Sequence, residues 1–173
     1  MVLCPNRAEH IGLILKTGDF VLPVVQRVLD HIVSLGCSWL ICPVVAIDDL
    51  VHTAELMRRI EAAGVEHYVI GNGTNLLISD KGLDAIVVRI GEKMANVERS
   101  GRTIIAGAGA SYAAMAKQSV QWGLMGLEWA AGIPGTVGGA VAMNAGAYGG
   151  EMKDVLESVT FLDDNLQLRT LPV

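Results

Sequence analysis

The chain has 173 residues, of which 51% are hydrophobic and 18% are charged, so its composition excludes an intrinsically disordered protein. Its net charge is −5 and its lysines and arginines are scattered, which excludes the basic footprint of a nucleic-acid-binding protein. No apolar run reaches the roughly 18 residues of a membrane span, and no secretory signal is recognisable, so we expect neither nucleic-acid nor membrane partners.

The cysteines and histidines do not indicate metal or disulfide chemistry. Neither residue type shows ligand spacing, the cysteine count is odd, and no C-x-x-C occurs. We therefore expect no bound metal and reduced thiols, as in a cytoplasmic protein. The residues concerned are Cys4, Cys37, Cys42, His10, His31, His52 and His67.

The first half of the chain alternates predicted helices and strands. Apolar residues recur at helical spacing over 19–35, and the short apolar run 39–42 predicts a strand. Asp48 is a candidate N-cap for a helix that runs through Ile60 and ends at Gly64. Two further predicted strands, 67–70 and 84–90, flank a glycine-rich loop.

A second unit is predicted to begin near residue 103. A strand over 103–107 leads to Ser111, which can cap a helix that ends at Gly123. A stretch rich in small residues follows over 126–150. The chain then finishes with a predicted hairpin whose turn lies at Asp164 and Asn165.

The first glycine-rich loop, "GNGTN" at 71–75, follows a strand directly. Two glycines allow backbone amides to turn outward as a nest for an anion, and Thr74 and Asn75 add side-chain donors. The loop suits a pyrophosphate without any positive charge, but an ordinary strand-to-strand turn explains it equally well. A dinucleotide G-x-G-x-x-G fails here at Leu76 and at Tyr112 in "GAGASY", and no P-loop sequence occurs.

The second stretch, "GLEWAAGIPGTVGGAVAMNAGAYGG" at 126–150, has eight glycines in 25 residues, and its only charge is Glu128. Pro134 fixes a turn, and Thr136 is a candidate helix N-cap. So many small residues allow a flat aromatic ring to lie against the main chain. They serve equally well in tight packing of a helix on a sheet.

These two stretches, together with "AGAGASYAAMA", resemble the UDP-N-acetylenolpyruvoylglucosamine reductase (MurB) family from about residue 44 to residue 173. This family consists of FAD enzymes of bacterial cell-wall synthesis. The resemblance implies an α+β fold, namely the vanillyl-alcohol-oxidase (PCMH) type of FAD-binding domain with two α+β subdomains. It divides the chain into an atypical segment at 1–43, subdomain 1 at 44–98 and subdomain 2 at 99–173.

The resemblance also implies cofactor-binding residues and an activity. In the family, NADPH reduces the flavin, which passes hydride to UDP-N-acetylglucosamine enolpyruvate to give UDP-N-acetylmuramate. The FAD pyrophosphate would lie against Gly71, Asn72, Gly73, Thr74, Asn75 and Leu76. The flavin and its ribityl chain would lie against Gly132, Ile133, Pro134, Gly135, Thr136, Gly138, Gly139, Asn144, Gly146 and Ala147.

Two departures from the family pattern limit what is carried over. Members of the family carry an N-terminal FAD-binding segment with paired glycines and a basic residue. This chain has "HIVSLGCS" at the same place, 31–38, which lacks both. A frameshift or an alternative start would produce such a departure. The family's catalytic arginine, serine and glutamate match positions beyond Val173, so we expect the substrate-binding C-terminal domain to be absent. No catalytic residue is therefore assigned, and the chain alone is expected to be inactive. Glu128 and Tyr148 are interpreted as structural parts of the glycine-rich wall.

Two alternatives stay open. One is another oxidoreductase on the same FAD scaffold, such as a sugar or lactone oxidase. The other is a non-catalytic FAD-binding or partner-docking module. The high mean hydropathy of +0.44 and the C-terminal hairpin favour an exposed apolar face that docks on a partner.

Overall fold

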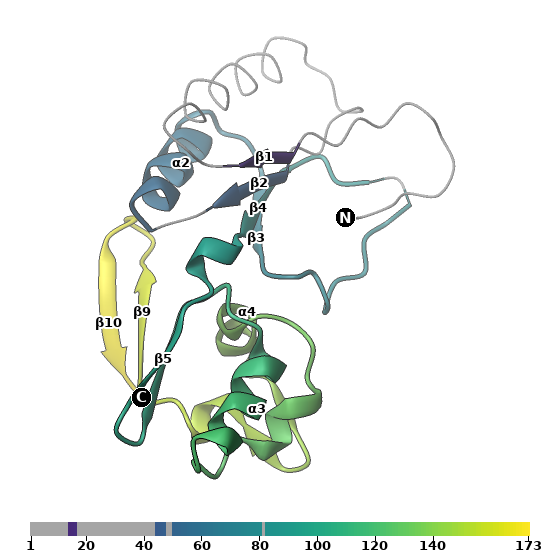
Figure 1. Cartoon of the computed structure of the whole chain (residues 1–173). Coiled ribbons are helices and arrows are strands. Elements are labelled where there is room, and N and C mark those ends of the chain that lie inside the picture. The colour runs from purple at the N-terminus through teal and green to yellow at the C-terminus, as the bar shows by residue number, and fades with distance from the viewer. Residues whose placement is uncertain (1–13, 17–43, 48–49, 81) are drawn as a thin grey trace. The chain divides into compact units, whose positions relative to one another are not determined.

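The computed structural model divides the chain into two compact units (Figure 1). The first unit holds the described residues up to Ile70 together with Leu76–Arg89. The second unit holds Gly71–Asn75 together with Ile90–Val173. The structure describes residues 14–16, 44–47, 50–80 and 82–173.

Several predictions fall outside the described residues. These are the helix over 19–35, the strand over 39–42, the cap at Asp48 and the departure at 31–38. The assignment of 44–98 and 99–173 as two FAD-binding subdomains stays a prediction.

The first unit is built on a four-stranded sheet in the order β1-β2-β4-β3. β1 runs parallel to β2, and β3 runs parallel to β4, in which Ile86, Val87 and Val88 are all buried. A run of consecutive buried apolar residues is typical of a strand covered on both faces. The strands are β1 (Ile14–Lys16), β2 (Val44–Ile47), β3 (His67–Ile70) and β4 (Ile86–Ile90).

Helix α2 (Leu50–Ala62) packs beside β2. Its residues Leu56, Met57 and Ile60 are buried, which is the helical spacing of one apolar face. The helix ends as predicted at Gly64, which has φ +64 and so takes the left-handed conformation that a C-terminal glycine allows.

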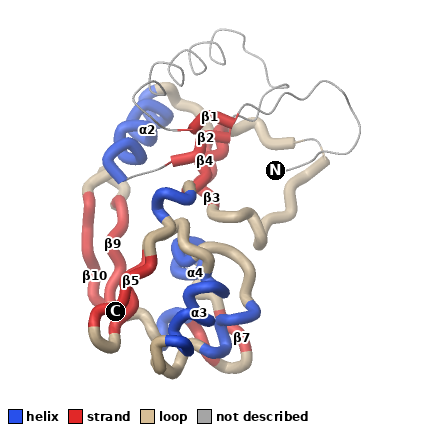
Figure 2. The backbone as a smooth tube through the Cα atoms, viewed as in Figure 1, coloured by secondary structure: helices blue, strands red, loops and turns tan. Residues whose placement is uncertain are grey.

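The second unit combines short helices with antiparallel hairpins (Figure 2). Strand β5 was not predicted, whereas the helix after Ser111 and the C-terminal hairpin are confirmed. The hairpins are β5 (Val97–Ser100) with β6 (Thr103–Ala106), β7 (Gly146–Ala147) with β8 (Gly150–Glu151), and β9 (Ser158–Leu162) with β10 (Leu168–Pro172). The helices are η1 (Glu92–Met94), α3 (Tyr112–Gln121), η2 (Glu128–Gly132), α4 (Val137–Ala142) and η3 (Met152–Asp154).

Local signals set the helix ends of this unit. The Ser111 hydroxyl accepts a hydrogen bond from the Ala114 amide at 3.3 Å, so the predicted N-cap of α3 is confirmed. Gly123, with φ +69, follows the end of α3. In the last hairpin, the Asp163 carboxylate accepts hydrogen bonds from the backbone amides of Asn165 and Gln167, both at 2.9 Å, which fixes the turn.

Tyr112 lies at the centre of the core of the second unit. Its side chain is fully buried, and its ring meets that of Trp129 edge to face, with centroids 6.1 Å apart. The hydroxyl has only a weak contact, 4.0 Å from the Met152 sulfur. Small residues of the 126–150 stretch belong to the same core, whose buried members are Ala110, Tyr112, Met115, Ala116, Leu127, Ala130, Val137, Ala140 and Met152.

The ring of Tyr112, rather than its hydroxyl, stabilises this core. We expect Tyr112→Ala to lower the free energy of unfolding by about 3–5 kcal/mol, because it leaves a large cavity. Tyr112→Phe removes only the weak contact to Met152 and should change it by less than about 1 kcal/mol. Urea unfolding followed by tryptophan fluorescence measures both, and a large effect of Tyr112→Phe would contradict this account.

Burial also makes the stability of this unit sensitive to high pH. It raises the pKa of Tyr112 from 10.0 to about 12, because the tyrosinate would lose its hydration. The unfolded chain therefore ionises first, so the stabilisation is fully present below pH 10.0 and is lost as the pH rises toward 12. We expect the urea midpoint to fall more steeply over this range in the natural chain than in Tyr112→Phe.

Candidate functional site

The first glycine-rich loop packs directly on the second. The Thr74 hydroxyl donates a hydrogen bond to the Pro134 carbonyl oxygen at 3.4 Å, joining residues 60 apart in the sequence. The main chain at Gly71 lies against the side chain of Thr136, so closely that a Cβ on Gly71 would overlap the threonine hydroxyl. Both contacts lie within the second unit, to which residues 71–75 belong although they leave strand β3 of the first.

The 71–75 loop presents unpaired backbone donors. Gly73 has φ +70, and Thr74 and Asn75 form an exposed turn. Within the part of the chain that the structure describes, the amides of Gly73, Thr74 and Asn75 donate no hydrogen bond. Consecutive amides that have no acceptor in the described protein are available to an anion.

The turn at 133–137, on which this loop packs, is also hydrogen-bonded to the segment around the start of α3. Gly135, with φ +120, offers its carbonyl to the amide of Tyr112 at 3.1 Å. The amide of Val137 donates to the carbonyl of Ala110 at 2.8 Å. Thr136 accepts a hydrogen bond from the amide of Gly139 at 3.3 Å, which confirms it as the N-cap of α4.

Three glycines of the second stretch are required by packing of the protein itself. A Cβ on Gly138 would lie 2.8 Å from the Cβ of Ala108, and one on Gly150 would lie 2.6 Å from the Trp129 ring. A Cβ on Gly146 would lie 2.8 Å from the carbonyl oxygen of Gly150 across the β7–β8 hairpin. At these three positions the tight-packing interpretation of the sequence accounts for glycine.

Gly132, at the end of η2, is different. It is exposed, its φ lies outside the left-handed region, and no atom lies within 4 Å of the position of an added Cβ. Nothing in the described protein therefore requires glycine at this position. The main chain at Gly132 is therefore accessible to an external group, and a side chain at this position would limit how closely such a group can approach.

Asn144 is held by neighbours in its own hairpin. Its amide nitrogen donates to Glu151 at 2.8 Å, and its side-chain oxygen accepts from the Lys153 amide at 3.0 Å. The hydrogen bond from the Lys153 ammonium, with that from Asn144, holds the pKa of Glu151 below its ordinary value. The Asn144 side chain thus closes the turn that leads from α4 to β7 and β8.

Glu128 and Tyr148 have separate positions. The Glu128 carboxylate accepts a hydrogen bond from the amide of Gly126 at 2.8 Å and so braces the start of the glycine-rich stretch, which agrees with its interpretation as a structural residue. Tyr148 has φ +54 and is 96% exposed, so its ring projects into solvent and does not cover the neighbouring glycines.

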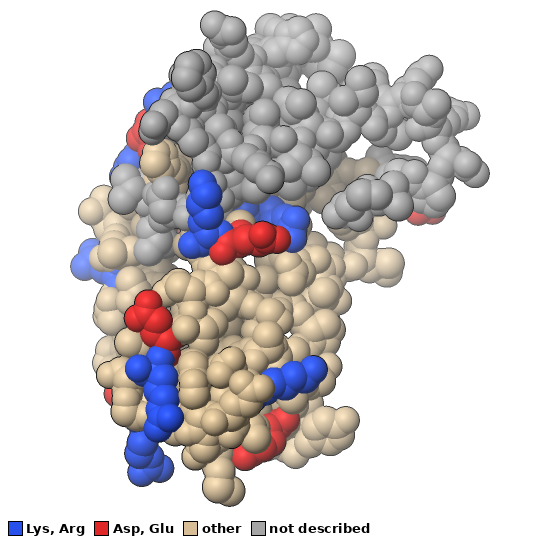
Figure 3. All heavy atoms as spheres, viewed as in Figure 1, with Lys and Arg blue, Asp and Glu red and all other residues tan. Residues whose placement is uncertain are grey.

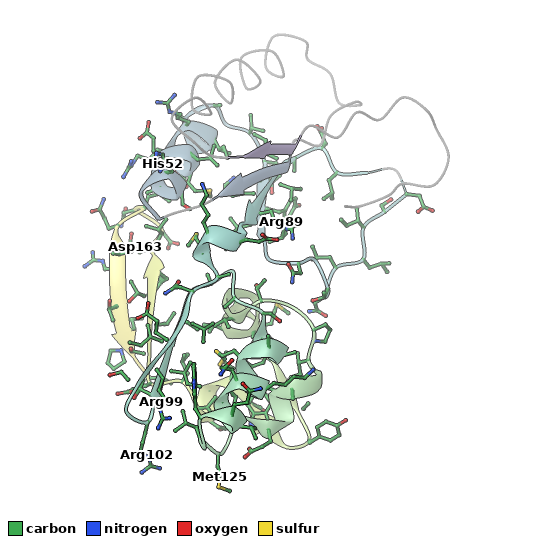
Figure 4. The ribbon with its side chains drawn as sticks, viewed as in Figure 1. His52, Arg89, Arg99, Arg102, Met125 and Asp163 are labelled. Atoms are coloured by element: carbon green, nitrogen blue, oxygen red, sulfur yellow. The ribbon has the colours of Figure 1, made fainter. Side chains whose placement is uncertain are left out.

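The two loops carry no positive charge. Residues 71–76 and 132–147 contain no lysine or arginine. On the face shown in Figure 3, basic side chains are interspersed with acidic ones. Arg99 of the β5–β6 hairpin, labelled in Figure 4, donates to the carbonyl oxygens of Gly101 and Trp122 at 2.8 and 2.9 Å. An anion at the first loop would therefore be held by amides and hydroxyls.

Residues 43–171 match the protein family described as FAD binding domain. The chain belongs to the FAD-binding domain family. The predicted α+β fold class and FAD as the cofactor of the family are thereby confirmed. Among the residues that the structure describes, no group of three histidine, cysteine or acidic side chains could hold a metal ion. No helix in the described ranges is long and apolar enough to cross a membrane.

Relatives of this FAD-binding domain include enzymes named UDP-N-acetylenolpyruvoylglucosamine reductase. The one from Alkaliphilus oremlandii is 48% identical over 103 residues, which is 60% of this chain and 34% of that protein. The one from Agathobacter rectalis is 43% identical over 135 residues, covering 71% of this chain and 43% of that protein. The resemblance found in the motifs is thus confirmed.

A solved structure shows the same fold. The crystal structure of the reductase MurB from Thermus caldophilus aligns with a TM-score of 0.59 and 33% identity, over 75% of this chain and 45% of that one. The FAD-binding domain described here spans between 34% and 43% of the length of the curated relatives it matches.

Glycine is required by packing at position 138 but not at position 132. Substitution by alanine should therefore have opposite effects on the stability of the ligand-free protein at the two positions. Gly138→Ala overpacks the contact with Ala108 and should lower the free energy of unfolding by about 1–3 kcal/mol. Gly132→Ala has room and restricts only the unfolded chain, so it should raise stability by about 0.4–1 kcal/mol. Thermal unfolding without ligand measures both, and equal destabilisation by the two variants would contradict the assignment.

Proposed function

We propose that this chain is the FAD-binding part of a UDP-N-acetylenolpyruvoylglucosamine reductase. The observation that carries the proposal is the packing of residues 71–75 on Pro134 and Thr136, because it brings together the two stretches that the family resemblance assigns to one cofactor. The identity of 42–48% to enzymes of this name supports the same activity.

The diphosphate of FAD would lie at the first loop. The amides of Gly73, Thr74 and Asn75 can donate to phosphate oxygens, and Asn72 contributes to the same outward turn. Gly71 supports the loop through its contact with Thr136. Leu76, which the resemblance also assigns to FAD, is 52% exposed. Because no lysine or arginine is present in this loop, recognition depends on the direction of the amides and not on net charge.

The flavin and ribityl chain would lie along the second stretch. Gly132 is the position where the main chain is open to an approaching group, and Ile133, Pro134 and Gly135 continue from it to the contact with the first loop. The remaining residues assigned to this wall are Thr136, Gly138, Gly139, Asn144, Gly146 and Ala147. FAD bound there would supply hydride chemistry, while the protein supplies orientation and excludes water.

The full reaction needs groups beyond these two loops. Glu128, the only carboxylate of the 126–150 stretch, is engaged with the Gly126 amide, and the Tyr148 side chain stands in solvent at 96% relative exposure. A proton donor for the enolpyruvyl carbon must therefore come from elsewhere in the complete enzyme. We accordingly propose NADPH as reductant and UDP-N-acetylglucosamine enolpyruvate as substrate of the complete cytoplasmic protein, with no detectable turnover by this chain alone.

A partner-docking module is the second candidate function. It is favoured by large apolar side chains that stand in solvent, among them Leu77 at 102% and Met125 at 91% relative exposure. Met125 projects away from the ribbon in the loop after α3 (Figure 4). A chain that binds no FAD but co-purifies as a complex would favour this candidate.

FAD titration of the purified chain tests the first proposal. We expect a flavin absorption band and a higher melting temperature, since a ligand at about 100 times its Kd adds about 2.7 kcal/mol of stability. Gly132→Ala should weaken FAD binding by about tenfold or more, because its methyl group would stand between the ligand and the main chain. The exposed substitution Gln121→Ala on α3 is the control and should leave the affinity unchanged.

Three outcomes of that titration separate the candidates. Failure of the natural chain to take up FAD would overturn the cofactor proposal. Equal affinity of Gly132→Ala and the natural chain would exclude Gly132 from the binding wall. Turnover of the UDP-sugar by this chain alone would show that its own residues suffice for catalysis, against our expectation.

A further inference from the structure

We propose that Thr136 is a positioning residue that seats the 71–75 loop before FAD binds, through close contact with the main chain of Gly71. The inference rests on the proposed function, because it concerns the assembly of the same FAD site. It goes beyond the direct binding of FAD, since it assigns Gly71 and Thr136 a task toward each other in the free protein.

Glycine at position 71 is explained by this contact alone. The φ of Gly71 lies outside the left-handed region, so the backbone there does not itself require glycine. An ideal Cβ at this position would overlap the Thr136 hydroxyl oxygen, and it would lie 3.1 Å from Cγ2 and 3.2 Å from Cβ of the same side chain. Three atoms of one threonine thus occupy the space that any other residue at 71 would need.

Thr136 is itself fixed and therefore provides a rigid support. The residue is buried, with a relative exposure of 3%, and its hydroxyl accepts a hydrogen bond from the Gly139 amide at 3.3 Å. A backbone bridge pairs Thr136 with Ser111, at the start of α3. The threonine therefore has two separable tasks, the cap of α4 and the seat of Gly71.

The packing contact outweighs the hydrogen bond that accompanies it. The bond from Thr74 to the Pro134 carbonyl is 3.4 Å long, well beyond the 2.7–2.8 Å usual for a hydroxyl donor, and it is exposed to water. Seating at Gly71 holds the loop near its start, so the amides of Gly73 to Asn75 are oriented before an anion arrives. Preorganisation of this kind raises affinity by lowering the entropy lost on binding.

A double-mutant cycle in the ligand-free protein tests the contact. Gly71→Ala should lower the melting temperature by about 4 °C or more in the natural background, where the new methyl group meets Thr136. In a Thr136→Gly background the space is empty, and glycine is a fair N-cap, so Gly71→Ala should then shift the melting temperature by less than about 1 °C. In a Thr136→Ser background the hydroxyl oxygen remains, and the full effect should persist.

FAD affinity provides the second readout of the same variants. Gly71→Ala should raise the Kd for FAD at least about tenfold in the natural and Thr136→Ser backgrounds, and less than about threefold in Thr136→Gly. Equal effects of Gly71→Ala in all three backgrounds, in melting temperature and in Kd, would overturn the proposal. If the natural chain binds no FAD, the proposed function fails, whereas coupling between the two residues in the ligand-free melts would still support the seat.

Discussion

The close approach of main chain at Gly71 to the side chain of Thr136 is the contact on which the candidate site depends. The loop 71–75 follows strand β3 in the sequence but belongs to the second unit. The contact attaches this loop to the N-terminus of α4 in the same unit. The segment 133–137 is held by this loop on one side and by the amide of Tyr112 and the carbonyl of Ala110 on the other.

The glycines of this protein fall into three physical classes. Some hold a left-handed backbone, as Gly64 and Gly135 do. Others admit a neighbouring group within the protein, as Gly138 admits Ala108. Gly132 belongs to neither class. Within 132–139, it is the one glycine that neither the backbone conformation nor the packing of the described protein requires, so an external ligand is left as the reason for it. Within one stretch of small residues, some glycines can thus serve internal packing while another stays available to a ligand.

A neutral site has consequences for recognition. If FAD binds as proposed, the absence of lysine and arginine from both loops makes long-range attraction of the anion weak, so selectivity would come from the backbone amides. This requires a loop that is ordered before binding. The buried Thr136, the core around Tyr112 and the brace from Glu128 to Gly126 provide that order within one unit.

The sequence by itself determined the family, the caps at Ser111 and Thr136, the end of α2 at Gly64 and the last hairpin. Each of these depends on residues three to five positions apart, or on a motif long enough to be specific. The sequence missed strand β5, because the pattern over 97–100 carries no clear apolar alternation. Only the tertiary structure decided which glycines serve packing and that Gly71 lies on Thr136. The contact of Gly138 with Ala108 joins residues 30 positions apart, and that of Gly71 with Thr136 joins residues 65 positions apart. Both are set by how closely two segments pack, which no local pattern encodes.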